Sequence, residues 1–472
     1  MKNYLIIAAS LGALLYACAR MAQPQVGSSP LPVPNCFCAD TSRCNTLCSL
    51  LPIDVNEDVS RVGYDSDLDP VKQTPFDIFS WQTFIALNWP AGPDGHPLSV
   101  GLQDSTGVFR VWEYYTDPAE IFEGSTQAGL LTHLTGTRAA QRKFFYMDSK
   151  SPNLSIDLHG FREADGKPLI DRNLNFAVYE VKVNPDETNY LRRNKLTTLD
   201  GIYDYYLSHN GQGLEFPASN YPDTIGSMEV KAAWRILDPS KGDDPSRYYT
   251  REAVIYLSPE KTKSGKADTI HATVGLVGMH IIRKTKQLNG FLIWTTFEHI
   301  DNTPDNPQAA QDSQDTTRRW SFYNPACLTC PVNTAPKSGP NNQYLWNDKP
   351  PYALDYATSI PSEHNGQKFG TQVTRSYPIY FTTQQVNAVW QEKLKGTVWA
   401  NYRLIGTQWA LAESFPMPIA PNALGNTTLE TYLQVDASCI GCHQGASVQK
   451  ITPAKDTVRI PTDMSFIFLG LK

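Results

Sequence analysis

The chain has 472 residues, of which 41% are hydrophobic and 19% charged, so it is expected to bury a core and is not an intrinsically disordered polypeptide. Its net charge of −6 at pH 7 argues against nucleic acid as a partner. With 34 Pro, 30 Gly and many aromatic residues, the composition favours strands and turns over a helical bundle.

The N-terminus has the pattern of an export signal. Lys2 precedes an apolar run, Tyr4–Tyr16, that is too short to span a bilayer. We expect residues 1–18 to be a signal peptide of the lipoprotein type, which would leave Cys18 lipidated and the protein anchored to a membrane. Ordinary cleavage after Ala19 is the alternative, and it would remove Cys18. Both readings export the protein to the periplasm, the outer membrane or the cell surface.

Residues 19–70 are expected to form a tether that ends in a cysteine cluster and an acidic stretch. Cys327 and Cys330 form a second group farther along the chain. An even number of such cysteines in an exported protein predicts disulfides. We therefore expect a structural disulfide between Cys327 and Cys330, with a redox dithiol as the alternative. Disulfides are also favoured over zinc in the cluster, whose pairing stays open: Cys36, Cys38, Cys44 and Cys48.

Residues 71–425 are expected to form a β-rich α+β body, and residues 426–472 a short helical haem-binding segment. Thr74-Pro75 predicts a helix that runs to Leu87, and a second helix is expected over Gln384–Lys395. The spacing of Thr427 and Glu430 is that of a capping box and predicts a third helix. Strands are expected over six runs: 109–112, 176–181, 229–237, 272–285, 291–300 and 398–409.

The motif that carries chemistry lies near the C-terminus, where Cys439-Ile440-Gly441-Cys442-His443 reads C-x-x-C-H. Two thiols three positions apart lie on one face of a helical turn, from which they reach the two vinyl groups of a porphyrin. The adjacent His443 then presents an imidazole nitrogen to the iron. The alternative is a local disulfide beside a histidine that binds nothing. We predict one covalently bound c-type haem.

In these residues the sequence resembles c-type cytochromes, and the resemblance covers about the last 45 residues. Small soluble cytochromes c carry the motif near their N-terminus and an axial Met downstream. Here only residues 444–472 follow it, so the upstream body is expected to cover one face of the haem. The whole chain also resembles large monohaem bacterial proteins of the cytochrome c family, a resemblance that implies no defined reaction. The matching segments are SWQTFIALNWP, EVKAAWRIL, TFEHIDN and LIGTQW.

The sixth iron ligand decides between electron transfer and chemistry at the iron. Met464 and Met417 are the methionines nearest the motif, and Met464 is the first candidate; core packing is the alternative role for each. Asn289-Gly290 predicts a tight hairpin turn that would place His280 directly opposite His299. Two adjacent imidazoles could ligate haem, bind a metal or act as an acid–base pair, whereas ordinary strand residues are the competing interpretation.

Haem propionates need cationic partners, and three basic residues follow the motif. Arg459 is the first candidate because its planar guanidinium pairs well with carboxylates. Lys450 and Lys455 are further candidates. A solvated basic loop is the competing interpretation.

Three functions remain open. Electron transfer at the cell envelope, with a redox partner protein, is the first. A haem enzyme of the peroxidase or oxygenase type with an open iron is the second, and the size of the body favours it. The third is a ligand-binding lipoprotein whose haem senses or stabilises. No hydrolase or nucleotide-binding motif competes with these.

Overall fold

The computed structural model describes residues 47–55, 70–102, 108–122, 143–147, 163–220, 224–286, 292–305, 307, 319–327, 329–359, 366–410, 419–469 and 471. By its contacts the chain divides into two units, Met1–Cys36 and Phe37–Lys472, and all described residues belong to the second. The signal peptide, most of the tether and Met417 therefore lie outside the described residues. No helix among the described residues is long and apolar enough to cross a membrane.

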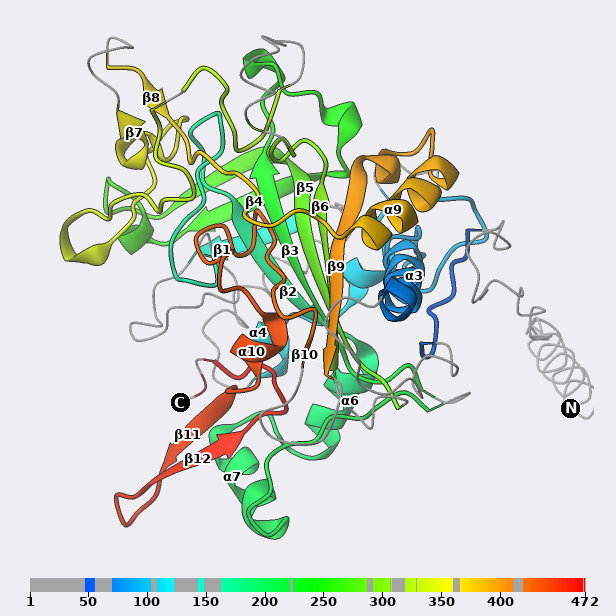
Figure 1. The fold of residues 1–472 in the computed structure, drawn as a ribbon. Coiled ribbons are helices and arrows are strands. Elements are labelled where there is room, and N and C mark those ends of the chain that lie inside the picture. Colours follow the sequence, from blue (N-terminus) through cyan, green and yellow to red (C-terminus); the bar gives the residue numbers. More distant parts are fainter. Residues whose placement is uncertain are drawn as a thin grey trace, which may run out of the picture. The chain divides into compact units, whose positions relative to one another are not determined.

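A large sheet organises the second unit (Figure 1). Its main path is β1-β4-β5-β6-β9-β10, and β3 joins β5 to β2. Only the pair β1–β4 is parallel; the other pairs in the sheet are antiparallel. The strands are β1 (Lys143–Met147), β2 (Val178–Val183), β3 (Met228–Ile236), β4 (Thr250–Leu257), β5 (Asp268–Lys284), β6 (Leu292–His299), β9 (Tyr402–Ala410) and β10 (Ile419–Ala420).

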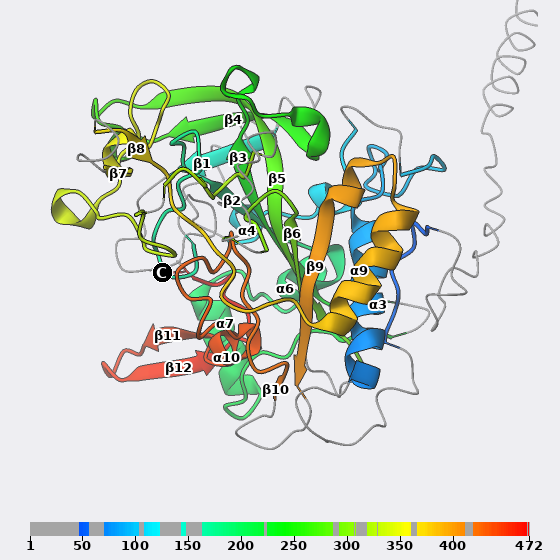
Figure 2. The same cartoon turned by 45° about the horizontal axis from the view of Figure 1, so that its top comes forward.

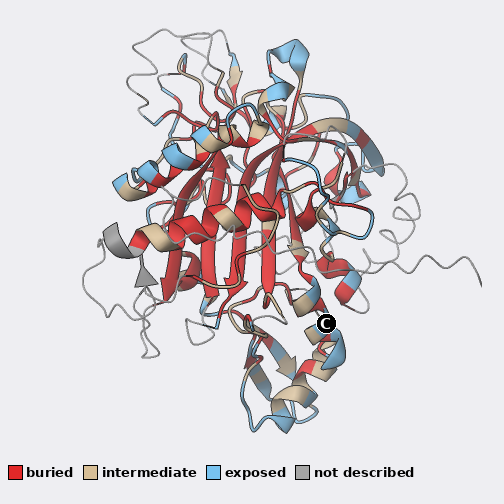
Figure 3. Cartoon of the chain, turned by 90° about the vertical axis from the view of Figure 1, so that its right-hand side faces the viewer, coloured by how far each residue is buried: buried red, intermediate tan, exposed pale blue. Residues whose placement is uncertain are grey.

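Two helices cover one face of this sheet, α3 (Pro70–Leu87) and α9 (Phe381–Lys393) (Figures 1 and 2). Trp81 and Phe84 of α3 pack on Phe297 of β6, and Trp81 also stacks on Trp390 of α9. The strands beneath are buried, as Figure 3 shows. This face holds the largest apolar cluster of the protein's described part, and it supplies most of the hydrophobic stabilisation.

The C-terminal segment covers the other face. It contains the short helix α10 (Cys439–His443) and the hairpin of β11 (Ser447–Ile451) and β12 (Thr457–Pro461). Figure 2 shows this hairpin and α10 on the side of the sheet away from α3 and α9. The remaining elements surround the sheet: α4 (Pro118–Ile121), α6 (Pro185–Arg193), α7 (Leu199–Ser208), β7 (Thr358–Ser359), β8 (Lys368–Phe369) and, among the described residues, seven short 3-10 turns, of which η1 (Val111–Tyr114) and η8 (Val398–Asn401) matter below.

The α+β class with a β-rich body and a short C-terminal helix is confirmed. Three local predictions were wrong. The strand expected over 398–409 begins only at Tyr402, because Val398–Asn401 forms the 3-10 turn η8. Residues 109–112 were expected to be a strand, but Val111–Tyr114 forms the 3-10 turn η1 with Glu113 bonded back to the Arg110 amide. Thr427 was expected to cap a helix, but its hydroxyl donates to Glu298, and residues 427–436 form successive turns. The disulfide Cys327–Cys330 is confirmed, and Cys48 is also disulfide-bonded.

The hairpin of β5 and β6 has a different register from the predicted one. His280 pairs with Thr296, and Ile282 with Trp294, so His280 and His299 do not face each other. The connection that would have set the register, 287–291, lies outside the described residues. The register differs from the expected one by three residues. Because an odd shift moves side chains to the opposite face, the two imidazoles lie on opposite sides of the sheet.

Asp77 is a buried carboxyl between α3, α9 and β9. It accepts hydrogen bonds from Gln73, Thr383 and Thr407. Burial nevertheless raises the pKa of Asp77 to about 6, because desolvation outweighs these hydrogen bonds. A carboxyl whose pKa is raised in the folded state stabilises the fold when protonated, and this contribution is lost as the pH rises from about 4 through about 6.

We predict that Asp77→Asn removes this pH dependence. The difference in the free energy of unfolding, variant minus wild type, should become more positive by about 3 kcal/mol from pH 4 to pH 8. The reason is that one pKa unit corresponds to about 1.4 kcal/mol. Urea unfolding at both pH values measures the difference. A constant offset between the two proteins would contradict the prediction.

Candidate haem-attachment site

The motif residues form one helical turn. Ser438 caps α10 by accepting a hydrogen bond from the Gly441 amide, and this fixes the turn at its first residue. The thiols of Cys439 and Cys442 therefore lie on the same side of the turn, and both are free. Cys327 and Cys330 have the same spacing and are joined. Of these two pairs, the one followed by histidine has its thiols available for thioether formation.

His443 is held as a neutral imidazole with one defined tautomer. Its Nδ1 lies 2.8 Å from the Met464 carbonyl oxygen, which accepts the Nδ1 proton because a carbonyl cannot donate. Its ring packs between Trp294 and Phe466. Burial lowers the pKa of His443 to about 4. The lone pair of Nε2 could therefore bind a metal, and a hydrogen bond donated by the other ring nitrogen is the usual support of a histidine that does so.

A strained turn delivers the Met464 carbonyl. Asp463 and Met464 have φ angles of 51° and 64°, a left-handed conformation that costs energy for residues other than Gly. The Asp463 carboxylate secures the turn, because its Oδ2 accepts from the Phe216 amide at 2.7 Å and from Lys284 Nζ at 2.6 Å. Lys284 is the last residue of β5, so the sheet itself supports the orientation of His443.

The position of Met464 bears on its expected role as sixth ligand. Its carbonyl contacts His443 at Nδ1, on the side of the ring opposite Nε2. The side chain of Met464 packs against the apolar cluster that contains Trp294, Cys439 and Ile440. The main-chain carbonyl of Met464 thus supports His443, and the role of its side chain as an iron ligand stays a prediction.

The sheet face under α10 carries a buried histidine. His280 of β5 is 7% exposed, and its Nε2 lies 3.3 Å from Glu430 Oε2 without forming an aligned hydrogen bond. Burial alone would raise the pKa of Glu430, but nearby His280 brings it below its usual value. His280 and Lys231 of β3 also lie close enough to lower the pKa of His443. His280 therefore belongs to the surroundings of the motif.

His299 has no such position. It lies on the helix-covered face, stacked on Tyr248 and edge-on to Tyr402. Its Nε2 donates to the Arg247 carbonyl, and its Nδ1 accepts from the Asp301 amide. Burial lowers the pKa of His299 to about 4. Both nitrogens are occupied by backbone groups, so His299 is a structural residue.

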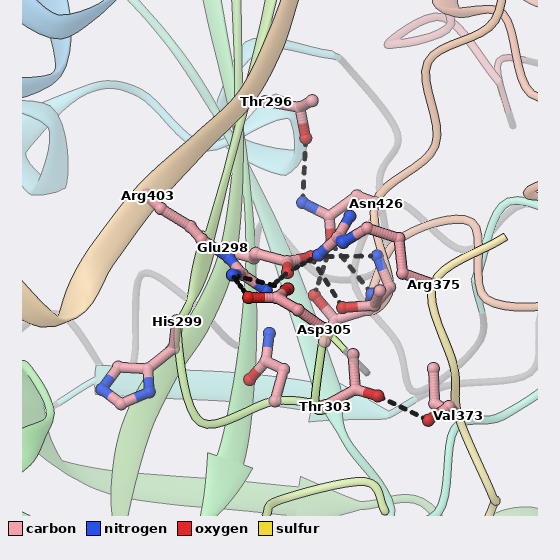
Figure 4. A network of polar contacts seen from close by, with 12 residues as sticks. Thr296, Glu298, His299, Thr303, Asp305, Val373, Arg375, Arg403 and Asn426 are labelled. Carbon is pink, nitrogen blue, oxygen red and sulfur yellow. Dashed lines mark hydrogen bonds and ion pairs between the residues drawn. The ribbon is translucent and has the colours of Figure 1, made fainter. Parts of the chain in front are cut away.

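Buried Glu298 anchors the chain that leads to the motif (Figure 4). Its carboxylate pairs with Arg375 and with Arg403, and it accepts the Thr427 hydroxyl at 2.7 Å. Next to it, Asn426 donates to Thr296 Oγ1 and to the Phe297 carbonyl. These contacts fix the start of the C-terminal segment on β6. No local sequence pattern predicts this role for Glu298.

Two further contacts set how closely the segment approaches the sheet. Gly278 of β5 leaves room for Thr428, since a Cβ atom there would lie 2.2 Å from the Thr428 hydroxyl oxygen. Gln408 of β9 accepts the Ile440 amide at 2.9 Å and donates to Ser438 at 3.2 Å. The first turn of α10 is thereby attached to the sheet. Nothing in the local sequence pattern pointed to either residue.

The basic residues after the motif lie on the exposed hairpin. Arg459 of β12 donates to the Ser447 hydroxyl and to the Gly445 carbonyl, each at 2.7 Å. It therefore fastens the hairpin to the residue two positions beyond His443, and its role towards a propionate stays a prediction. Lys450 pairs with Asp200 of α7, and Lys455 occupies the hairpin turn with a φ of 67°.

No family model, curated protein or solved structure matches this chain. The functional argument therefore rests on the residues themselves.

We predict that Glu298→Gln weakens the attachment of the C-terminal segment. Removing the anion leaves the buried Arg375 guanidinium without its carboxylate partner and leaves Arg403 paired with Asp305 alone, which costs about 3 kcal/mol or more. Chemical unfolding measures the loss. Glu252→Gln, at an exposed position of β4, is the control and should change the stability by less than about 0.5 kcal/mol. Equal stabilities of the two variants would refute the anchoring role.

Proposed function

We propose that this chain is an exported monohaem c-type cytochrome that transfers electrons at the cell envelope. The observation that carries the proposal is the combination of two free thiols on one capped helical turn with a neutral His443 whose Nδ1 proton is already donated. Cys439 and Cys442 would form the thioether bonds, and Nε2 of His443 would bind the iron. When bound, haem supplies a one-electron redox centre.

The surroundings of the motif suit such a centre. Trp294, Phe466 and Ile440 provide apolar contacts on the His443 side, and a dry, low-dielectric shell tunes a reduction potential. Cys442 is exposed, whereas Cys439 is buried. The two attachment points therefore run from the interior to the surface. An attachment point at the surface favours electron transfer to a docking protein, since a redox partner can approach that edge.

We propose that His280 would be the second side chain to hold the haem. Its imidazole is buried and lies close enough to His443 to lower the pKa of that residue, whereas the Met464 carbonyl contacts Nδ1 of His443. The Glu430 carboxylate, 3.3 Å from Nε2 of His280, would stabilise the imidazole electrostatically. Two protein ligands would leave no open position for a substrate.

A haem enzyme with an open iron is the second candidate. The contact between His280 and Glu430 favours it, because such a pair next to a bound haem could hold or move a proton. The two candidates differ in whether the iron has a free coordination position.

Export is proposed on the basis of the N-terminal pattern. The Cys327–Cys330 disulfide supports it, because such bonds persist in oxidising compartments. A lipid anchor at Cys18 remains part of the proposal, and mass spectrometry of the N-terminal peptide from the mature protein tests it.

We predict that replacing Cys439 and Cys442 with Ala abolishes covalent haem staining of the denatured protein made in a host that attaches c-type haem. The matched control replaces Cys327 and Cys330, which have the same spacing but no histidine, and it should keep full staining. Staining that survives loss of the motif thiols would disprove the attachment.

We predict that Met464→Leu leaves the absorption spectrum low-spin, because the main-chain carbonyl supports His443. His280→Ala should yield a high-spin spectrum that shifts with carbon monoxide, because it opens a coordination position. Exposed His271→Ala is the control and should match the wild type. A wild-type protein that already binds carbon monoxide would favour the enzyme instead, and a spectral change in Met464→Leu would restore Met464 as the ligand.

A further inference from the structure

A polar cavity lies away from the C-x-x-C-H motif. Its volume is about 240 Å³, and it is lined by two segments around Arg319–Asn324 and Gln367–Gln372 together with Arg172. Three of its lining side chains are cationic: Arg172, Arg319 and Lys368. No acidic side chain lines it among the described residues. This composition is unusual in a protein of net negative charge.

The walls of the cavity are built rigidly. Asp171 caps the turn that presents Arg172 by accepting the amides of Asn173 and Asn175. Gly370 lets the opposite wall approach this turn, because a Cβ atom there would lie 2.2 Å from the Asp171 carbonyl oxygen. The Thr371 amide then bonds to the Ile170 carbonyl. Arg172 and Lys368 are thus held on the same cavity by backbone contacts.

The carboxylates closest to the cavity, those of Asp171 and Asp243, form ion pairs with the buried Arg235. Arg235 is buried and pairs with both Asp171 at 3.1 Å and Asp243 at 3.0 Å. Arg319 reaches Asp243 only through Nε at 3.5 Å, and its Nη2 donates to Asn173. Within the part of the chain that the structure describes, neither the Arg172 guanidinium nor the Lys368 ammonium has a hydrogen bond or an ion pair. Among the described residues, these two cationic groups therefore line the cavity without a carboxylate in direct contact.

The cations also repel one another. Burial lowers the pKa of Arg172, and the positive charges of Arg319 and Arg235 lower it further, while the Asp243 carboxylate offsets part of this shift. An anion in the cavity would relieve this repulsion and would meet donors that are already oriented. Guanidinium groups bind phosphate and carboxylate oxygens in a bidentate manner, and a lysine adds a point charge.

We propose that this cavity is a binding site for a small multivalent oxyanion, held by Arg172, Lys368 and Arg319. The site is independent of the haem motif. Its volume admits a phosphate-bearing or polycarboxylate metabolite rather than a single halide ion. Thr371 of the cavity wall contacts the Tyr432 hydroxyl at 3.2 Å, so the wall itself touches the segment that leads to the motif.

The test is calorimetric titration of the haem-loaded protein with inorganic phosphate and, separately, with citrate, in sodium chloride at constant ionic strength. Wild type should bind at least one of them with one site per chain. Arg172→Gln and Lys368→Gln should each weaken binding about tenfold or more, because each removes a charge-assisted hydrogen bond. Arg193→Gln, at an exposed position at the end of α6, should bind like wild type.

A second readout separates binding from folding. Without added anion, Arg172→Gln should melt at or above the wild-type temperature, since the substitution removes a repelled charge. Phosphate or citrate should raise the melting temperature of wild type and Arg193→Gln, and not that of Arg172→Gln. Tighter binding of phosphate would identify the ligand as a phosphate-bearing compound, and tighter binding of citrate would identify it as a polycarboxylate. Absence of binding to wild type, or equal binding by all four proteins, would overturn the proposal.

Discussion

The attachment of the C-terminal segment to the sheet is the contact on which the arrangement at the motif depends. Glu298, Asn426 and Gln408 provide the polar part of this attachment, and Gly278 permits the close approach. Glu298 is fully buried with two arginines, an arrangement whose value lies in specifying one position for the segment as much as in net stability.

Strain and burial are concentrated behind His443. Two successive left-handed residues aim a carbonyl at the imidazole, and a lysine at the end of β5 neutralises the carboxylate that holds the turn. Such conformations persist only where the surrounding structure compensates for their cost. The result is a histidine with a defined tautomer in an apolar setting. A ring nitrogen with an unused lone pair distinguishes His443 from His299, whose two nitrogens bond to the backbone.

The two faces of the sheet differ in the side chains that they carry. The face under α3 and α9 is filled by aromatic packing and gives the body its stability. The opposite face carries charged and polar side chains on β3, β5, β6 and β9, among them Lys231, His280 and Glu298. Buried polar groups on a sheet are costly unless they are paired, so their concentration on one face marks where the protein is specialised.

The sequence by itself determined the class of the fold, most strand positions, the Cys327–Cys330 disulfide and the residues of the motif. These follow from local rules, because hydrophobic periodicity and cysteine spacing act over a few residues. Only the tertiary structure decided the register of β5 and β6, the turns at residues 427–436, and the separation of His280 from His299. It also decided that the Met464 carbonyl contacts Nδ1 of His443, and that Arg172 and Lys368 share a cavity. Each of these depends on contacts between segments far apart in the chain, and a one-residue change in strand register reverses every side chain, so no local pattern can specify them.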